Sequence, residues 1–143
     1  MSKVAIVFWS GTGNTQEMAE TIEKGAKAAG ADTSLFEVES FDQGTLKDYD
    51  GICFGCPAMG DEVLEEGTFE PFFAEIEGSL TDVPVALFGS YGWGGGAWMK
   101  DWEERTKHAG AKLFADGLAV ENAPDADALA ACEKLGKAFA ESL

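Results

Sequence analysis

Short, continuous apolar runs alternate along the chain with longer segments in which apolar residues recur every three or four positions. The runs predict buried strands, and they lie at residues 4–9, 34–38, 51–55, 84–89 and 111–120. The periodic segments predict helices at residues 12–29, 69–76, 97–108 and 125–143. Because strands alternate with helices, we expect an α/β fold, a doubly wound five-stranded parallel sheet with helices on both faces.

The organisation of the chain indicates one unit. No linker, repeat or low-complexity segment divides it, so we expect a single domain over residues 1–143. Its apolar runs are well short of the roughly 18 residues that a membrane span needs. Met1-Ser2-Lys3 leads directly into an apolar run without a signal-peptide cleavage region, which favours a cytoplasmic location.

Negative charge dominates the composition. Against 10 Lys and Arg stand 26 Asp and Glu, which gives a formal net charge of −16. Such a surface repels nucleic acid and anionic membranes, and it attracts a basic protein partner. Solubility alone is the other explanation of this charge, and composition does not decide between the two.

The three cysteines are Cys53, Cys56 and Cys132, and the odd number argues against a secreted disulfide framework. Cys53 and Cys56 have C-x-x-C spacing, which occurs in dithiol redox motifs at the start of a helix. Here Cys53 lies inside an apolar run that reads as a strand. We therefore predict structural thiols, and we expect no metal site from three scattered cysteines and one histidine.

A segment of small polar residues follows the first predicted strand and opens the first helix. It consists of Ser10, Gly11, Thr12, Gly13, Asn14 and Thr15. Backbone N–H groups at a helix start, surrounded by hydroxyls, predict an anion cradle. The segment is neither a dinucleotide fingerprint, because Gln16 stands where the third glycine is required, nor a Walker loop. Ordinary capping of the helix is the alternative interpretation.

Two further loops follow the third and fourth predicted strands. The first contains Pro57, Ala58, Met59, Gly60, Asp61 and Glu62, and the second contains Ser90, Tyr91, Gly92, Trp93 and Gly94. Ligands of such sheets bind beyond the carboxyl ends of the strands. Met59 and Trp93 are side chains that suit contact with a planar ring, although each alone could simply belong to the core. Together with the cradle, they favour a site for a phosphorylated ring compound.

The motifs SGTGNT, AMGDE and SYGWG, at these intervals, resemble the flavodoxin family over the whole chain. The length and the fifth predicted strand, which carries no insertion of roughly 20 residues, look like the short-chain class with clostridial and sulfate-reducer members. The resemblance implies the strand order 2-1-3-4-5, a non-covalently bound FMN and a one-electron carrier rather than an enzyme. It also implies a cytoplasmic monomer that meets basic reductases or other oxidoreductases.

The resemblance assigns roles to residues at matching positions. Phosphate ligands would be Ser10, Thr12, Asn14 and Thr15, with nearby backbone N–H groups. Met59 and Trp93 would flank the two faces of the ring. Gly60 would lie by flavin N5, Glu62 by N3, and residues 90–92 by the pyrimidine edge. The loop 121–124, which contains Asn122, could add contacts to the ribityl chain or the ring edge.

A one-electron carrier must stabilise the neutral semiquinone and destabilise the anionic hydroquinone. A Gly60–Asp61 peptide that turns toward N5 after reduction would do the first, because glycine adopts positive φ freely. The ten carboxylates of residues 48–99, a span without Lys or Arg, would do the second and lower the potential. Alternative functions are an FMN-dependent NAD(P)H:quinone oxidoreductase of the same fold and an FMN-storing protein. A phosphoacceptor receiver domain is excluded, because the acidic pair and the lysine that it needs are missing.

Overall fold

A computed structural model describes residues 2–59, 63–92 and 96–143. All of the strands in this part of the chain run parallel in one sheet with the order β2-β1-β3-β4-β5, and β6 also pairs with β4. The strands are β1 (Lys3–Phe8), β2 (Asp32–Glu37), β3 (Gly51–Gly55), β4 (Pro84–Tyr91), β5 (Lys112–Leu113) and β6 (Leu118–Glu121). The predicted α/β class and strand order are therefore confirmed.

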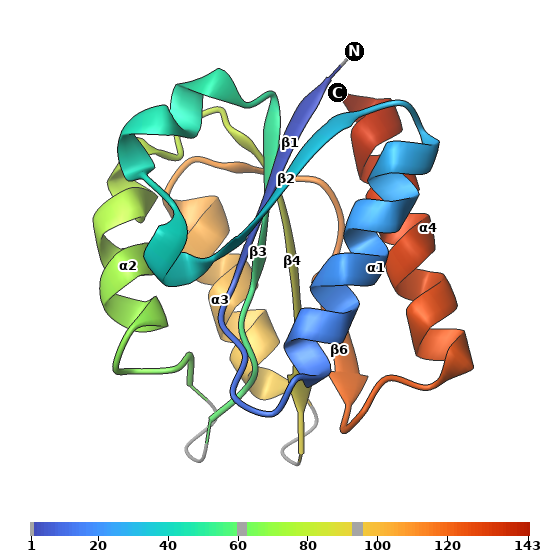
Figure 1. Ribbon diagram of the computed structural model, residues 1–143. Helices are drawn as coiled ribbons and strands as arrows, with labels where there is room; N and C mark the ends of the chain where they lie inside the picture. The colour runs from blue at the N-terminus through green and yellow to red at the C-terminus, as the bar shows by residue number, and fades with distance from the viewer. Residues whose placement is uncertain (1, 60–62, 93–95) are drawn as a thin grey trace.

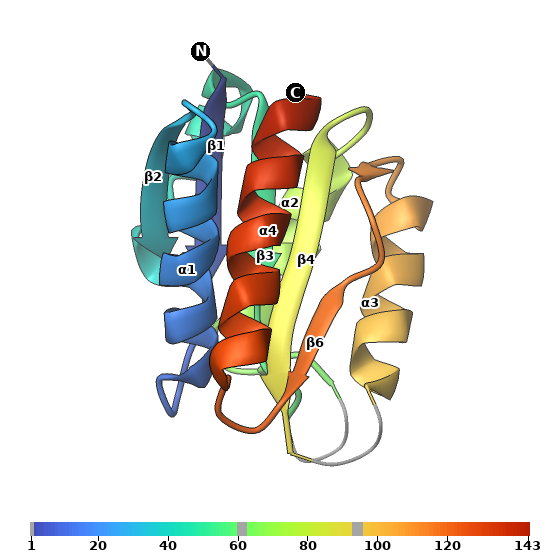
Figure 2. The ribbon, with the colours of Figure 1, turned by 90° about the vertical axis from the view of Figure 1, so that its right-hand side faces the viewer.

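Helices cover both faces of the sheet. They are α1 (Asn14–Ala28), α2 (Phe69–Ile76), α3 (Ala97–His108) and α4 (Ala126–Ser142). Figure 1 shows α1 and α4 on one face and α2 and α3 on the other, and Figure 2 turns the face with α1 and α4 toward the viewer. Short 3-10 turns at Val38–Ser40, Gln43–Asp48 and Glu77–Ser79 complete the connections. Among the described residues, no helix is long and apolar enough to cross a membrane.

The hydrophobic core has two layers because the central strands are buried on both faces. Along β1, Val4 and Ile6 belong to the layer under α1 and α4, whereas Ala5 and Val7 belong to the layer under α2 and α3. This alternation follows from the period of two in a strand. It explains why the sequence shows continuous apolar runs here instead of alternating polar and apolar positions.

The fifth predicted strand, 111–120, is divided into two short strands in the structure. β5 pairs with the start of β4 and β6 with its end, so that both occupy the same edge position of the sheet. Residues 114–117 separate them, and the Asp116-Gly117 pair there is a typical turn dipeptide. The Gly117 N–H donates to the Glu103 carboxylate of α3 at 2.6 Å, instead of to a neighbouring strand. The prediction of one continuous strand missed this interruption.

The cysteines are core side chains, as predicted. Cys53, Cys56 and Cys132 are all buried and free. Cys53 and Cys132 lie in the layer under α1 and α4, and Cys56 lies in the layer under α2 and α3. The two thiols of the C-x-x-C sequence therefore stand on opposite faces of the sheet. Burial raises the pKa of each, that of Cys132 to about 12, so all three stay protonated at neutral pH.

Candidate functional site

A pocket of about 280 Å³ lies where β1, β3, β4 and β6 end. Its walls come from four segments that are distant in sequence. They are Trp9, Gly11, Thr12 and Asn14; Pro57, Ala58 and Met59; Ser90, Tyr91 and Gly92; and Asn122. The structure thus brings the three predicted loops together at one sheet edge. A second hollow of about 540 Å³, beside Glu77 and His108 near the ends of α2 and α3, contains none of the predicted site residues.

The loop between β1 and α1 arranges hydroxyl groups around the first N–H groups of the helix. Gly13 adopts a φ of 96° just before α1, a left-handed conformation that favours glycine. The Ser10 Oγ accepts from the N–H groups of Gly13 at 3.1 Å and Gln16 at 3.3 Å. The Thr12 Oγ1 lies 3.5 Å from the Asn14 nitrogen, whose N–H it accepts. These bonds pair the N–H groups of Gly13, Asn14 and Gln16, and they place neutral hydroxyl donors at the positive end of the helix dipole.

A buried hydrogen bond joins this loop to the end of β4. The hydroxyls of Thr15 and Ser90 lie 3.2 Å apart, and the two residues are only 1% and 5% exposed. The Thr15 hydroxyl therefore faces Ser90, whereas Ser90 also lines the pocket. This bond fixes the start of α1 relative to the Tyr91 loop.

The loop after β3 is tied to its surroundings at both ends. The Ala58 N–H donates to the Ser90 carbonyl, and the Met59 N–H donates to the Val63 carbonyl, both at 2.9 Å. Met59 is 38% exposed and forms part of the pocket wall. Gly60, Asp61 and Glu62, to which the sequence assigned roles beside the ring, lie outside the described residues.

The loop after β4 and the loop after β6 lie next to each other. The Asn122 N–H donates to the Tyr91 carbonyl at 2.7 Å, and Asn122 has a φ of 58°, which asparagine tolerates better than most residues. The Tyr91 ring packs on Trp98, with centroids 5.5 Å apart. Asn122 thus lines the pocket beside Tyr91 and Gly92. Trp93 and Gly94 lie outside the described residues.

Trp9 is a pocket residue that the sequence analysis did not single out as a site residue. It ends the first apolar run, and its ring lies against Gly11, so that a Cβ at position 11 would come within 2.9 Å of it. The signal was present, because a large aromatic residue stood directly before the small polar segment at the carboxyl end of a strand. The predicted strand 4–9 includes it as its last residue.

The sequence analysis gave all ten carboxylates of span 48–99 a role at the ring, but the structure does not bring all of them to the pocket. Asp50 directly precedes β3 and Asp82 precedes β4, which places both at the opposite edge of the sheet. There the Asp50 carboxylate accepts the N–H of Lys3, the first residue of β1, at 2.8 Å. The span crosses the length of the sheet three times, along β3, α2 and β4, and none of its carboxylates lies on the part that follows β4 at the pocket.

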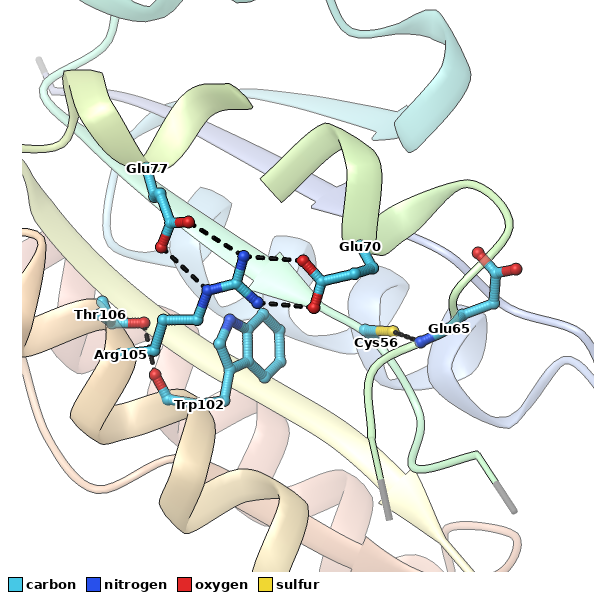
Figure 3. Close-up of polar contacts among 7 residues, drawn as sticks. All are labelled: Cys56, Glu65, Glu70, Glu77, Trp102, Arg105 and Thr106. Atoms are coloured by element: carbon cyan, nitrogen blue, oxygen red, sulfur yellow. Dashed lines mark hydrogen bonds and ion pairs between the residues drawn. The ribbon is translucent and has the colours of Figure 1, made fainter. Parts of the chain in front are cut away.

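Two other carboxylates of the span are paired by a cation from outside it. Arg105 of α3 forms hydrogen-bonded ion pairs with Glu70 of α2 and Glu77 of the 3-10 turn that follows it, at 2.6 and 2.9 Å (Figure 3). These carboxylates raise the pKa of the guanidinium further above its usual value. Of the remaining carboxylates, Glu65 and Glu66 lie on the segment between β3 and α2, and Asp61 and Glu62 lie outside the described residues.

The pocket suits a ligand with an anionic end and a flat, partly apolar end. The hydroxyls and N–H groups at the start of α1 can bind a phosphate, and Trp9, Met59 and Tyr91 offer ring and thioether surfaces. No Lys, Arg or His is among the described residues that line it. These residues fit FMN, whose phosphate would be held by neutral donors and the helix dipole. In the part of the chain that the structure describes, no group of three or more His, Cys, Asp and Glu could hold a metal ion.

Comparisons with known proteins agree with this geometry. The family model described as Flavodoxin matches residues 6–136. The chain is 48% identical over 135 residues to a flavodoxin of Clostridium beijerinckii, a match that covers 94% of this chain and 97% of that protein. It is 44% identical over 142 residues to a flavodoxin of Megasphaera elsdenii, covering 97% and 99%. The solution structure of the two-electron reduced Megasphaera elsdenii flavodoxin superposes with a TM-score of 0.86 at 46% identity, covering 96% of this chain and 98% of that one.

Proposed function

Because the chain belongs to the flavodoxin family, whose members bind FMN and transfer electrons rather than act as enzymes, we propose that it is a low-potential one-electron carrier whose FMN shuttles between semiquinone and hydroquinone. The observation that supports this most strongly is the meeting of the three predicted loops around one pocket. Residues 1–143 then act as one FMN-binding domain.

The phosphate end of FMN binds at the start of α1. Ser10, Thr12 and Asn14 supply side-chain donors, and the N–H groups around Gly13 supply the rest. Thr15 contributes through its N–H and by holding Ser90 at 3.2 Å. The helix dipole favours the dianion there, so binding needs no Lys or Arg in the loop.

The flavin ring lies between the loops that follow β3 and β4. Pro57, Ala58 and Met59 form one side of its slot, and Tyr91 and Gly92 form its edge. Trp93 would stack on the outer face, and Gly94 follows it in the sequence. Asn122 and Trp9 close the pocket toward the ribityl chain.

FMN supplies the electron chemistry, and the chain adjusts its energy through nearby peptides and charges. The carbonyl of the Gly60–Asp61 peptide would accept a hydrogen bond from the N5–H of reduced FMN, and glycine permits the φ that this orientation needs. The acidic residues 61–66 and the net charge of −16 oppose further negative charge on the ring, which lowers the second potential. Glu62 holds N3.

The carrier meets basic redox proteins, because its charge steers such partners toward the acidic loop beside the ring. It works as a monomer in the cytoplasm, where a reducing environment suits the three free thiols. The oxidoreductase alternative requires space for a nicotinamide over the ring. The Met59 and Tyr91 loops already line the pocket at that edge, which disfavours this alternative.

Titration of FMN-free protein with FMN tests this proposal. We expect saturable 1:1 binding with quenching of flavin fluorescence, and negligible turnover of NAD(P)H with a quinone by the loaded protein. Steady turnover would support the oxidoreductase, and failure to bind FMN would contradict both functions. The FMN-storing alternative predicts binding without a stabilised one-electron state.

A further inference from the structure

Cys56 occupies a junction between the pocket loops and the core. Its N–H donates to the Phe88 carbonyl at 3.1 Å, and its carbonyl accepts the indole N–H of Trp98 at 3.3 Å. Its Sγ accepts the N–H of Glu65 at 3.3 Å, as Figure 3 shows, and lies 3.5 Å from the Pro57 carbonyl, to which the thiol donates. The side chain is completely buried. A thiol with two such bonds is more than a filler of core volume.

Glu65, the partner of this thiol, is itself firmly held at the start of α2. Its carboxylate accepts the N–H groups of Gly67, Thr68 and Phe69 at 2.7, 2.7 and 2.8 Å, and its carbonyl accepts the Glu70 N–H at 2.8 Å. The Cys56 sulfur therefore connects the end of β3 to the first turn of α2. The segment between these anchors carries Met59 and the predicted ring contacts.

We propose that Cys56 is a positioning residue for the flavin, whose thiol fixes the two ends of segment 57–64 and so favours the one-electron-reduced cofactor over the oxidised one. This inference rests on the proposed function. A hydrogen bond that forms only after reduction stabilises the reduced cofactor less if the loop that supplies it must first become ordered, because ordering costs conformational entropy. Anchoring the two ends of the segment lowers this cost.

Burial keeps this anchor chemically constant. It raises the pKa of the Cys56 thiol well above its usual value, so the group stays a neutral thiol that both donates and accepts throughout the working range of pH. The nearby carboxylates Glu65 and Glu70 raise it further, while the Glu65 N–H acts in the opposite direction.

Cys53, which lies in β3 three residues before Cys56, provides a matched control. It is equally buried, but its thiol lies in the other core layer, under α1 and α4. Cys53→Ala and Cys56→Ala each remove one buried Sγ atom. A role in packing alone predicts similar consequences for both variants, whereas a positioning role predicts a difference at the flavin.

The test compares Cys56→Ala, Cys56→Val, Cys56→Ser and Cys53→Ala by spectroelectrochemistry and FMN titration. We expect Cys56→Ala and Cys56→Val to weaken binding of one-electron-reduced FMN at least threefold relative to oxidised FMN, which lowers the first potential by about 28 mV. Cys56→Ser keeps a donor and an acceptor and should stay within twofold of the parent, as should Cys53→Ala. If Cys56→Ala does not fold, the comparison is made with Cys56→Val instead.

Amide hydrogen exchange of the FMN-free protein gives a second readout. Exchange at Glu65 should accelerate at least tenfold in Cys56→Ala and stay unchanged in Cys53→Ala. Equal potentials in the parent and both non-polar Cys56 variants, with FMN still bound, would overturn this inference alone. Failure of the parent to bind FMN would overturn the proposed function and the inference together.

Discussion

Replacement of Arg105 by methionine should destabilise the fold because Arg105 connects α2 to α3. Its Nη1 and Nη2 donate to Glu70 at 2.6 and 2.7 Å, and its Nε and Nη2 donate to Glu77 at 2.9 and 3.0 Å. The guanidinium also lies 5.0 Å from the centroid of the Phe73 ring. Methionine retains an apolar stem over this ring, so the substitution mainly removes the charge and its hydrogen bonds.

The magnitude follows from geometry and exposure. Both ion pairs are bidentate, which favours them, but the side chains of Arg105, Glu70 and Glu77 are 28%, 37% and 29% exposed, so water screens them partly. We assign about 1 kcal/mol to each pair, near the upper end for partly exposed pairs. The expected loss is about 2 kcal/mol in the free energy of unfolding, or about 6 °C in Tm for a chain of this length.

Urea unfolding of FMN-saturated protein measures this loss, with Lys24→Met as the matched control. Lys24→Met also removes one positive charge, but the contact of Lys24 with Glu133 at 3.3 Å joins side chains that are 76% and 45% exposed. We expect the control to cost less than about 0.5 kcal/mol. The Arg105 effect should shrink at about 1 M salt, where the Debye length is about 3 Å. Equal losses in the two variants would refute the assignment and leave only a net-charge effect.

Three further predictions concern the cofactor site and the partner. Thr12→Ala should weaken binding of FMN much more than binding of riboflavin, which lacks the phosphate, whereas Trp93→Ala should weaken binding of both. Equal losses of affinity for the two ligands in the Thr12 variant, measured by fluorescence titration, would show that the phosphate site is elsewhere. Gly60→Ala should lower the first potential by the equivalent of roughly 1 kcal/mol, because a Cβ disfavours positive φ, and an unchanged potential would reject the turned peptide. Neutralising Glu62 and Glu66 should reduce the salt dependence of the rate of electron transfer to a basic acceptor in stopped-flow experiments, and it should raise the second potential. If the rate in the parent does not depend on salt, these carboxylates adjust the potential but do not select the partner.

The sequence predicted the architecture because its strands are buried on both faces. Runs such as 4–9 and 51–55 are apolar throughout, and the small polar segment after the first run marks the start of α1. The interruption at Asp116-Gly117 was missed because the residues on both sides are as apolar as a continuous strand. What divides the strand there is a contact with Glu103 of α3, which is distant in sequence.

For the pocket, sequence reasoning identified the loops better than the interactions between them. It placed Thr12, Met59 and Tyr91 at one edge, and the structure brings them together. It could not foresee that Arg105 would pair with two carboxylates of the acidic span. The place of Asp50 directly before the predicted strand 51–55 already implied the far edge, and the prediction for the acidic span overlooked this. Charge near a site depends on how often the chain crosses the sheet, and this information is not local in sequence.

Stepwise anaerobic reduction of the FMN-loaded protein, followed by visible absorbance, tests the central claim most directly. A one-electron carrier that stabilises the neutral semiquinone should change from yellow to blue after about one electron per flavin, and then become pale. A direct change from yellow to pale, with no blue species at any point of the titration, would contradict the account.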